Sequence, residues 1–413
     1  MTDIYIAGVG MTQFGKQIDI SLKEMTAAAV TDALADAGCE RDQLQGAFFG
    51  NCVQGHMEGQ DMIRGEVALR AMGIQGIPVV NVENACATAS TALHLAANYV
   101  KAGAADIVLA IGAEKMFSRD REKMFQAFDG GWDVHDVENS TKTLLKMGEG
   151  VEVPEGTTSD RPYSVFMDIY AAFSRLHMKK YGTTREALAA VSSKNHMHSV
   201  NNPKAQYRDP YTVEEILAAP PITYPLTLPM CSPISDGAAA AIVCNAAGLA
   251  SMKGDRARAA KLMASVLRTG SDRAPDDFES HISRRAADEA YRLAGVGAER
   301  MSVAEVHDAT ATGEVIEVEA LRLVPPGEGA RAAERGETAL GGRIPVNPSG
   351  GLECKGHPVG ATGLGQAYEL VTQLRGEAGE RQVPEAEFAI AQNGGGIIGV
   401  EESVTAVTII GRQ

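Results

Sequence analysis

The sequence predicts an α/β fold made of two similar halves, and three observations support this class. Runs rich in β-branched residues alternate with longer amphipathic stretches towards both ends of the chain. The alternation stops between residues 117 and 228, which hold the only Trp and several polar linkers. It then resumes, and the last part of the chain repeats the plan of the first. We therefore expect an N-terminal half at 1–116 completed by 229–256, an inserted loop or lid domain at 117–228, and a C-terminal half at 257–413.

In the N-terminal half, the segment after residue 20 carries the clearest helix signals. Ser21 is a candidate N-cap, Glu24 takes the capping-box position, and Gly38 is suited to end the helix. The other elements follow from apolar positions that recur with the period of a strand or of a helix. We expect strands at 3–9, 44–51, 77–82 and 106–115, and helices at 62–73 and 86–101.

The insert and the C-terminal half are predicted from the same signals. The insert contains one long apolar helix pattern, and buried strands return after it. The C-terminal half then alternates again between helix and strand. We expect an insert helix at 160–182, followed by strands at 236–245 and 260–270. In the C-terminal half we expect a helix at 283–296 and a strand at 303–310. A strand, a Gly-rich loop and a helix should follow within 344–376, and two closing strands within 388–409.

Charge and composition exclude several classes of partner. The net charge of −15 disfavours nucleic acid or an anionic membrane as a partner of the whole surface. None of the six cysteines has CxxC spacing, so we expect a reduced, cytoplasmic protein. No run of about 18 strongly apolar residues predicts a membrane-spanning helix, and the N-terminus lacks the pattern of a signal peptide.

The stretch VVNVENACATAS, residues 79–90, places a lone thiol at a predicted strand-to-helix corner. A helix N-terminus carries partial positive charge and free N–H groups, which lower the pKa of a thiol and stabilise a nearby oxyanion. The small neighbours Ala85, Ala87 and Ala89 allow a tight turn. Cys86 is therefore a candidate nucleophile, and the alternative is a buried structural thiol.

Two histidines are candidates for proton transfer and for oxyanion binding. His357 lies among glycines in GGLECKGHPVGATG, and Pro358 suits a first helical turn. We therefore expect His357 at a helix N-terminus, where its imidazole could take the proton of Cys86. His307, followed by Asp308, is expected at the end of a strand, facing the crevice in which ligands bind. It could donate to an oxyanion, and a structural His–Asp pair is the alternative.

Two further motifs contain residues that are common in binding sites. QNGGGIIG places Asn393 before three glycines, where bare backbone N–H groups suit a substrate oxygen. HMH at 196–198 could hint at a metal site. However, histidines at i and i+2 do not share a helix face, and no cysteine or acidic cluster joins them, so we expect no metal.

Together these motifs resemble the thiolase family. ENACATAS resembles its nucleophile loop, SPISDGAAAAIV resembles the segment that returns from the loop domain to the core, and KGHPVGATG is similar to its catalytic histidine loop. HDAT with SGGLECKGHP resembles the sterol-carrier-protein and acetyl-CoA acetyltransferase-like branch, which has His-Asp where other thiolases have Asn-Glu. The resemblance spans about residues 3–410. It implies a five-layered α/β/α/β/α fold with two core halves, a loop domain that binds coenzyme A, and a homodimer.

The resemblance also implies roles for individual residues. Cys86 attacks the 3-keto carbonyl of a 3-oxoacyl-CoA and takes the acyl group as a thioester. His357 activates Cys86 and helps to hold the thioester oxygen, and His307 assists that oxyanion hole. The backbone N–H groups of Cys86 and Gly395 form a second hole around the acyl-enzyme oxygen. Coenzyme A is a co-substrate, and no covalently bound cofactor is implied.

The sequence departs from the family at the second, acid/base cysteine. The position before the Gly-rich turn holds Asn393, and the position after His-Asp, which the sterol-carrier branch uses, holds Ala309. Cys354 is a candidate substitute, with a packing role as its alternative. A protonated His307 is another candidate acid.

Three functions fit these observations. The first is a thiolase that cleaves an unusual 3-oxoacyl-CoA, branched, aromatic or dicarboxylic, in the degradative direction, alone or with a small zinc-ribbon and OB-fold subunit. The second is a CoA-ester aldolase or a ketoacyl-synthase-like enzyme on the same scaffold. The third is a non-catalytic acyl-CoA-binding subunit. KGHPVGATG disfavours a synthase, while an intact Cys86 elbow with His357 disfavours an aldolase and a purely binding role.

Overall fold

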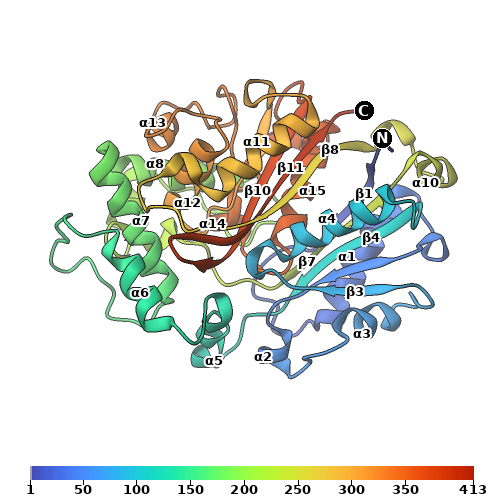
Figure 1. Ribbon diagram of the computed structural model, residues 1–413, viewed down its shortest axis with the longest axis horizontal. Coiled ribbons are helices and arrows are strands. Elements are labelled where there is room, and N and C mark those ends of the chain that lie inside the picture. Colours follow the sequence, from blue (N-terminus) through green and yellow to red (C-terminus); the bar gives the residue numbers. More distant parts are fainter. Residues whose placement is uncertain (1) are drawn as a thin grey trace.

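The computed structural model describes residues 2–413 and contains one large sheet, shown in Figure 1. The strand order is β3-β2-β4-β7-β1-β8-β11-β10-β9. The first five strands come from the N-terminal part of the chain, and the last four come from the C-terminal part. The two sets meet where β1 and β8 pair over Tyr5–Lys261 and Ile6–Ala260. The strands are β1 (Tyr5–Met11), β2 (Ala47–Gly50), β3 (Val79–Val82), β4 (Ile107–Glu114), β7 (Gly237–Cys244), β8 (Ala260–Thr269), β9 (Val303–Glu305), β10 (Phe388–Ile398) and β11 (Glu401–Gly411).

Helices and sheet halves alternate as five layers. One pair of helices buries the outer face of the N-terminal strands, and a second pair lies between the two sheet halves. A third pair covers the outer face of the C-terminal strands. The pair on the outer N-terminal face is α1 (Leu22–Ala37) and α3 (Arg64–Ala71). The central pair is α4 (Thr88–Lys101) and α15 (Thr362–Leu374). The pair on the outer C-terminal face is α11 (Ile282–Ala294) and α12 (Ala311–Ala320). The five-layered α/β fold expected from the sequence is therefore confirmed.

The C-terminal half repeats the strand order of the N-terminal half outward from the β1–β8 junction. A parallel β-bridge between Ala304 and Val346 places residue 346 beside β9. In the N-terminal half, β3 lies beside β2 in the same way. The connection after β3 carries Cys86 into α4, and the connection after Val346 carries His357 towards α15. The repeat therefore brings the two predicted catalytic loops to comparable places in the two halves.

The chain between β4 and β7 forms the insert. It consists of helices and a small two-stranded sheet, and the long helix pattern of the sequence becomes one of these helices. Its elements are α5 (Arg121–Gln126), α6 (Val137–Lys146), α7 (Val165–Tyr181), α8 (Arg185–Ser199), α9 (Val213–Ala218), β5 (Pro221–Thr223) and β6 (Leu226–Thr227). Four further short α-helices lie within residues 2–413: α2 (Gln54–Glu58), α10 (Ala246–Ser251), α13 (Gly329–Glu334) and α14 (Gly351–Lys355).

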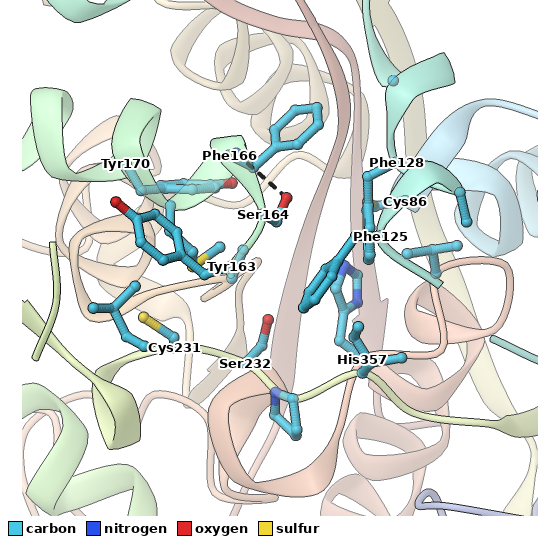
Figure 2. A pocket seen from close by; sticks show the side chains of 18 of the residues that line it. Cys86, Phe125, Phe128, Tyr163, Ser164, Phe166, Tyr170, Cys231, Ser232 and His357 are labelled. Atoms are coloured by element: carbon cyan, nitrogen blue, oxygen red, sulfur yellow. Dashed lines mark hydrogen bonds between the residues drawn. The ribbon is translucent and has the colours of Figure 1, made fainter. Parts of the chain in front are cut away.

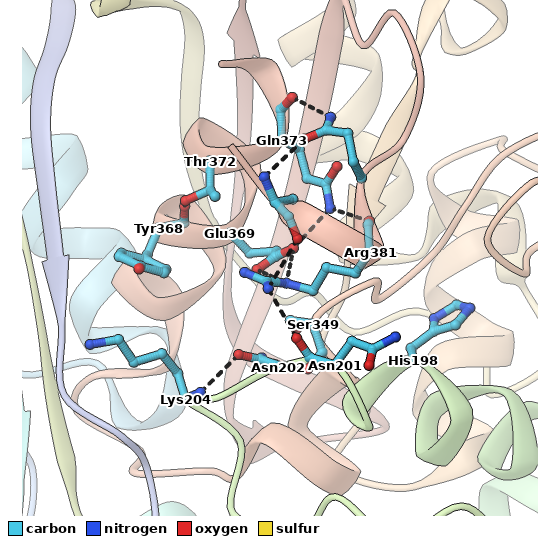
Figure 3. Close-up of polar contacts among 12 residues, drawn as sticks. His198, Asn201, Asn202, Lys204, Ser349, Tyr368, Glu369, Thr372, Gln373 and Arg381 are labelled. Atoms are coloured by element: carbon cyan, nitrogen blue, oxygen red, sulfur yellow. Dashed lines mark hydrogen bonds and ion pairs between the residues drawn. The ribbon is translucent and has the colours of Figure 1, made fainter. Parts of the chain in front are cut away.

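Polar contacts tie the end of α8 to the C-terminal half, as Figure 3 shows. The Nδ2 group of Asn202 donates to the carbonyl of Ser349 at 2.8 Å. Arg381 donates through Nε to both carboxylate oxygens of Glu369 on α15, at 3.0 and 3.1 Å, and through Nη1 to the carbonyl of Asn201. Because this ion pair is buried and its groups are hydrogen-bonded, it fixes the insert against the layer that carries the histidine loop.

Three local expectations were wrong. His307 does not end a strand, because β9 stops at Glu305. Pro358 does not begin a helix: its carbonyl accepts from the N–H groups of Ala361 and Thr362, and this turn delays the start of α15 to Thr362. The glycines after Asn393 are not a turn, since β10 continues through them and Gly395 pairs with Val404 of β11.

None of the helices within residues 2–413 combines the length and the apolar character that are needed to cross a lipid bilayer.

Candidate active site

A cavity of about 1200 Å³ lies between the core and the insert, and Cys86, His307 and His357 all border it (Figure 2). The sulfur of Cys86 and one nitrogen of each imidazole lie within 4.8 Å of one another. The two rings are nearly perpendicular, with centroids 5.1 Å apart. The structure therefore brings together the three side chains that the sequence suggested for chemistry, although 221 or more residues separate Cys86 from either histidine.

Cys86 lies in a single helical turn, Ala85–Ala87, between β3 and α4. Ala85 adopts a φ of 47°, a conformation that costs free energy for any residue with a Cβ atom. The hydroxyl of Thr88 holds the turn, because it donates to the carbonyl of Ala85 at 2.6 Å and accepts from the N–H of Asn84 at 2.8 Å. The small residues noted in the sequence thus permit a sharp corner that presents the thiol to the cavity.

The pKa of the Cys86 thiol does not follow the sequence-based expectation. Burial, with a smaller contribution from the charge of Glu114, raises this pKa to about 12. The N–H group of Cys86 itself lowers the pKa, as expected of a helix start, and so does the N–H group of Gly396 on β10. Desolvation outweighs them, so the resting sulfur carries its proton and needs a base to become a nucleophile.

His357 is positioned as that base. Its backbone N–H donates to Ser235 Oγ at 2.9 Å, and its Nδ1 lies 2.7 Å from Thr362 Oγ1. The Thr362 hydroxyl donates its own proton to the carbonyl of Pro358, so it accepts from Nδ1–H. The other nitrogen, Nε2, is then unprotonated. Burial and the neighbouring His307 also hold the pKa of His357 well below its usual range, which keeps the ring neutral.

His307 has the opposite tautomer. Its Nδ1 lies 3.0 Å from the amide nitrogen of Asn393, which can only donate, and Ser90 Oγ donates to the amide oxygen of Asn393 at 2.8 Å. The proton of the ring is therefore on Nε2, where it can bind an oxyanion. Burial lowers the pKa of His307 to about 4, which favours the neutral ring over the protonated acid considered from the sequence.

Gly395 brings bare backbone against the nucleophile. A Cβ atom built on Gly395 would lie 3.0 Å from the nitrogen of Cys86 and 2.7 Å from that of Ala87, so no other residue fits without movement. Asp308 supports the site from behind, because its carboxylate accepts from the N–H groups of Leu352 at 2.7 Å and Glu353 at 3.3 Å. These contacts anchor the start of α14, which leads into the histidine loop.

Two residues differ from the sequence-based view of the site. Cys354 is fully buried and is not among the residues that border the cavity, so it does not replace the second cysteine. Glu114 was not recognised as part of the site, although it ends a predicted buried strand. Its carboxylate accepts from Asn51 Nδ2 at 2.8 Å and from the N–H groups of Cys52 and Gly360 at 2.9 and 3.0 Å, which joins the two halves beneath the thiol.

The insert provides an aromatic wall for the cavity, and Figure 2 shows Tyr163 and Tyr170 across the cavity from Cys86. Three cations also border the cavity even though the whole protein is acidic. The aromatic residues of the lining are Phe125, Phe128, Tyr163, Phe166 and Tyr170, and the cations are Lys16, Arg121 and Arg161. The cavity therefore offers an apolar compartment and three cations, beside the carboxylates of Glu83, Asp160 and Glu402.

Comparisons with known proteins agree with this arrangement. Residues 4–217 match the family model for the thiolase N-terminal domain, and residues 265–410 match that for the thiolase C-terminal domain-like family. The chain is 39% identical to an acetyl-CoA acetyltransferase of Methanothermobacter thermautotrophicus, over 96% of this chain and 97% of that protein. It is 37% identical to sterol carrier protein 2 of Homo sapiens, over 96% of this chain and 71% of that protein.

More distant relatives extend the comparison. The benzoylsuccinyl-CoA thiolase subunit BbsB of Thauera aromatica is 31% identical over 92% of this chain and 91% of that protein. The Ltp2-ChsH2(DUF35) aldolase has a similar structure, with a TM-score of 0.76 at 22% identity over 99% of this chain and 98% of that chain. Human mitochondrial 3-ketoacyl-CoA thiolase in complex with CoA gives a TM-score of 0.70 at 16% identity, over 100% of this chain and 98% of that chain. These two structures support the fold alone.

Proposed function

The chain belongs to the thiolase family, and from this premise we propose that it is an acyltransferase that cleaves a 3-oxoacyl-CoA through a thioester on Cys86. One observation carries the proposal: a neutral base nitrogen on His357 and a hydrogen-bond donor on His307 lie beside one thiol. An acyl transfer needs both groups, because the thiol must lose a proton while the attacked carbonyl oxygen gains negative charge.

The first half-reaction follows from these positions. Nε2 of His357 takes the proton of the Cys86 thiol as the sulfur attacks the 3-keto carbon. The oxygen of the tetrahedral intermediate accepts from Nε2–H of His307. The bond between C2 and C3 then breaks, which leaves the acyl group on Cys86 and releases the enolate of a shortened CoA ester, which must gain a proton at C2.

In the second half-reaction, the thiol of coenzyme A loses its proton and attacks the Cys86 thioester. The backbone N–H groups of Cys86 and Gly395 are suited to hold the oxygen of this intermediate, because their backbones are in contact. The sulfur of Cys86 leaves and takes back its proton from His357. We propose Lys16, Arg121 and Arg161 as partners of the CoA phosphates, since phosphates favour charged hydrogen-bond donors.

The aromatic wall favours a bulky or aromatic acyl group over a short straight one, and we propose degradative cleavage as the direction. Aromatic side chains bind planar apolar groups by burial and by offset or edge contacts. We further propose a homodimer and, as the names of BbsB and of the Ltp2-ChsH2(DUF35) aldolase suggest for those proteins, a small partner subunit.

The test is direct detection of the acyl-enzyme. We expect the intact mass of the protein to rise by one acyl group on incubation with an aromatic 3-oxoacyl-CoA, and this adduct to disappear when coenzyme A is added. Cys86→Ala should form no adduct and should lose at least about 10⁴-fold in cleavage rate. An aldolase or a binding subunit would form no adduct, and cleavage that survives in Cys86→Ala would contradict the proposal.

A further inference from the structure

Three ionisable side chains form a second cluster beside the cavity, and the mechanism above does not use them. His281, Glu317 and Glu402 place one ligand atom each within 4.8 Å of one another. They come from the start of α11, from α12 and from β11, all in the C-terminal half. Of the three, Glu402 also borders the large cavity that Cys86 and the catalytic histidines share.

The hydrogen bonding of this cluster is incomplete. Glu317 is 1% exposed, and neither of its carboxylate oxygens has a partner among the described residues. The Oε2 atom of Glu402 also lacks a hydrogen-bond partner there, and it lies 3.7 Å from Nε2 of His281. Glu317 is buried, whereas the side chain of Glu402 is 18% exposed; two carboxylates so placed cannot both ionise without a cost in free energy.

The neighbouring positive groups do not offset that cost. Burial lowers the pKa of His281 to about 4, so this ring is neutral at neutral pH. Arg273 is already paired with Glu401 at 2.5 Å. Burial, followed by the charge of Glu402, raises the pKa of Glu317 well above its usual range. Protonation of Glu317 is therefore favoured, and a proton between the two carboxyl groups would give one oxygen of each a hydrogen-bond partner.

The pair is placed next to the reacting centre. A Cβ atom built on Gly394 would lie 2.7 Å from Cγ of Glu402 and 3.2 Å from its Oε1, so the glycine backbone packs directly on this side chain. The next residue, Gly395, packs on the nitrogen of Cys86. A small cavity of about 20 Å³, enough for one water molecule, lies beside Glu317 and Glu402.

We propose that Glu402, with a proton that it shares with Glu317, is the general acid/base that replaces the absent second cysteine. This inference rests on the proposed function. Glu402 gives its proton to C2 of the enolate when the C2–C3 bond breaks. The carboxylate then takes the thiol proton of coenzyme A as that thiol attacks the Cys86 thioester. The pair ends the cycle with the proton it had at the start, so no other reactant is required.

Two measurements on the same variants test this role. One is the uptake of deuterium from D₂O into the methyl group of acetyl-CoA, which reports proton transfer at C2. The other is the acylation of Cys86, measured by intact mass. For Glu402→Gln we expect Cys86 still to form the acyl adduct on long incubation, because His357 remains to activate the thiol, while deuterium uptake falls by about 10²- to 10⁴-fold. The same change at an exposed site, Glu387→Gln, should alter neither measurement.

The outcomes separate the two proposals. Absence of Cys86 acylation in the wild-type protein would overturn the proposed function itself. Normal acylation with undiminished deuterium uptake in Glu402→Gln would overturn only the role of Glu402. A loss of uptake in Tyr170→Phe but not in Glu402→Gln would assign the acid to the neighbouring phenol instead. A stoichiometric metal ion in the purified protein would also overturn the proposal, because the metal would occupy the carboxylate oxygens.

Glu317 is a positioning residue, and its test is a pH profile. Glu317→Gln removes the like charge beside Glu402, so Glu402 should lose its proton more easily. The loss of cleavage rate at high pH should then begin at lower pH than in the wild type. The groups that face the pair, His281, Tyr170, Arg273 and Glu401, are unchanged in this variant. An unchanged pH profile in Glu317→Gln would contradict a proton shared between Glu317 and Glu402. This measurement tests the shared proton even if Glu402→Gln does not fold.

Discussion

Asn51 in the N-terminal half and His307 in the C-terminal half occupy comparable places, just after β2 and just after β9. Asn51 donates to the carbonyl of Ala113 and to Glu114, both at 2.8 Å, and its oxygen accepts from Gln54 and Arg64. His307 uses only Nδ1 for support, and its second nitrogen remains free. In the N-terminal half, the polar atoms of the Asn51 side chain are all paired and support the structure. In the C-terminal half, Nε2 of His307 has no such support and is available for the proposed chemistry.

The same contrast holds for the two loops that lead to the central helices. The loop before α4 supplies the proposed nucleophile, but burial raises its pKa and favours the protonated sulfur. The loop before α15 supplies His357, whose hydrogen bond to Thr362 leaves one nitrogen free to take that proton. In the proposed mechanism the N-terminal half thus holds the reacting atom, and the C-terminal half holds both imidazoles.

The largest effect is expected from removing the base. His357→Ala should lower the cleavage rate by about 10²- to 10⁴-fold, because Cys86 would have to ionise without assistance. Steady-state cleavage of the 3-oxoacyl-CoA measures this loss. If the comparison between the halves is right, Cys86 in this variant is still alkylated at pH 9, and a loss of alkylation would mean that the N-terminal loop had been disturbed.

The next effect concerns the oxyanion donor. His307→Ala should reduce kcat by about 10²- to 10³-fold, the cost of one donor to a developing oxyanion. Asn51→Ala is the matched change in the other half. It should lower the free energy of unfolding by about 1–3 kcal/mol, since it leaves buried groups unpaired, and alter kcat by no more than a few-fold. Similar losses of kcat in both variants would contradict the division of roles.

The pH dependence of alkylation tests the state of the sulfur. With a thiol pKa of about 12 and a neutral imidazole, the thiolate fraction rises tenfold per pH unit below that pKa. We therefore expect the rate of Cys86 alkylation by iodoacetamide to increase about 100-fold between pH 7 and pH 9. A rate that is high at pH 7 and constant above it would instead indicate a thiolate–imidazolium pair.

The smallest effect is expected from the group that sets the tautomer of His357. Thr362→Val removes the acceptor for Nδ1–H and should lower kcat about tenfold, which corresponds to one lost buried hydrogen bond. Thr362→Ser keeps the hydroxyl and should restore most of the rate. If the serine variant were as slow as the valine variant, the methyl group of Thr362 rather than its hydroxyl would be responsible.

Local chemistry made much of the fold predictable. The capping box of α1 was expected at Ser21 and Glu24, and both of its hydrogen bonds are present, as is the left-handed Gly38. These features depend on residues within one helical turn of each other. The start of α15 and the extent of β10 were predicted wrongly, because a turn at Pro358 and pairing with β11 decide them, and neither follows from periodicity.

By itself, the sequence determined the alternation of strands and helices, the repeat of two halves and the residues capable of chemistry: Cys86, His307 and His357. Only the tertiary structure decided how these residues act. The bond that orients Asn393 spans 303 residues, from Ser90 in one half to β10 in the other. The pKa of Cys86 is raised because the folded chain excludes water around it. The tautomer of His307 depends on Asn393 of β10, although that of His357 depends on Thr362, five residues along the same loop. Desolvation and hydrogen-bond direction belong to the environment of a side chain, and folding alone creates that environment.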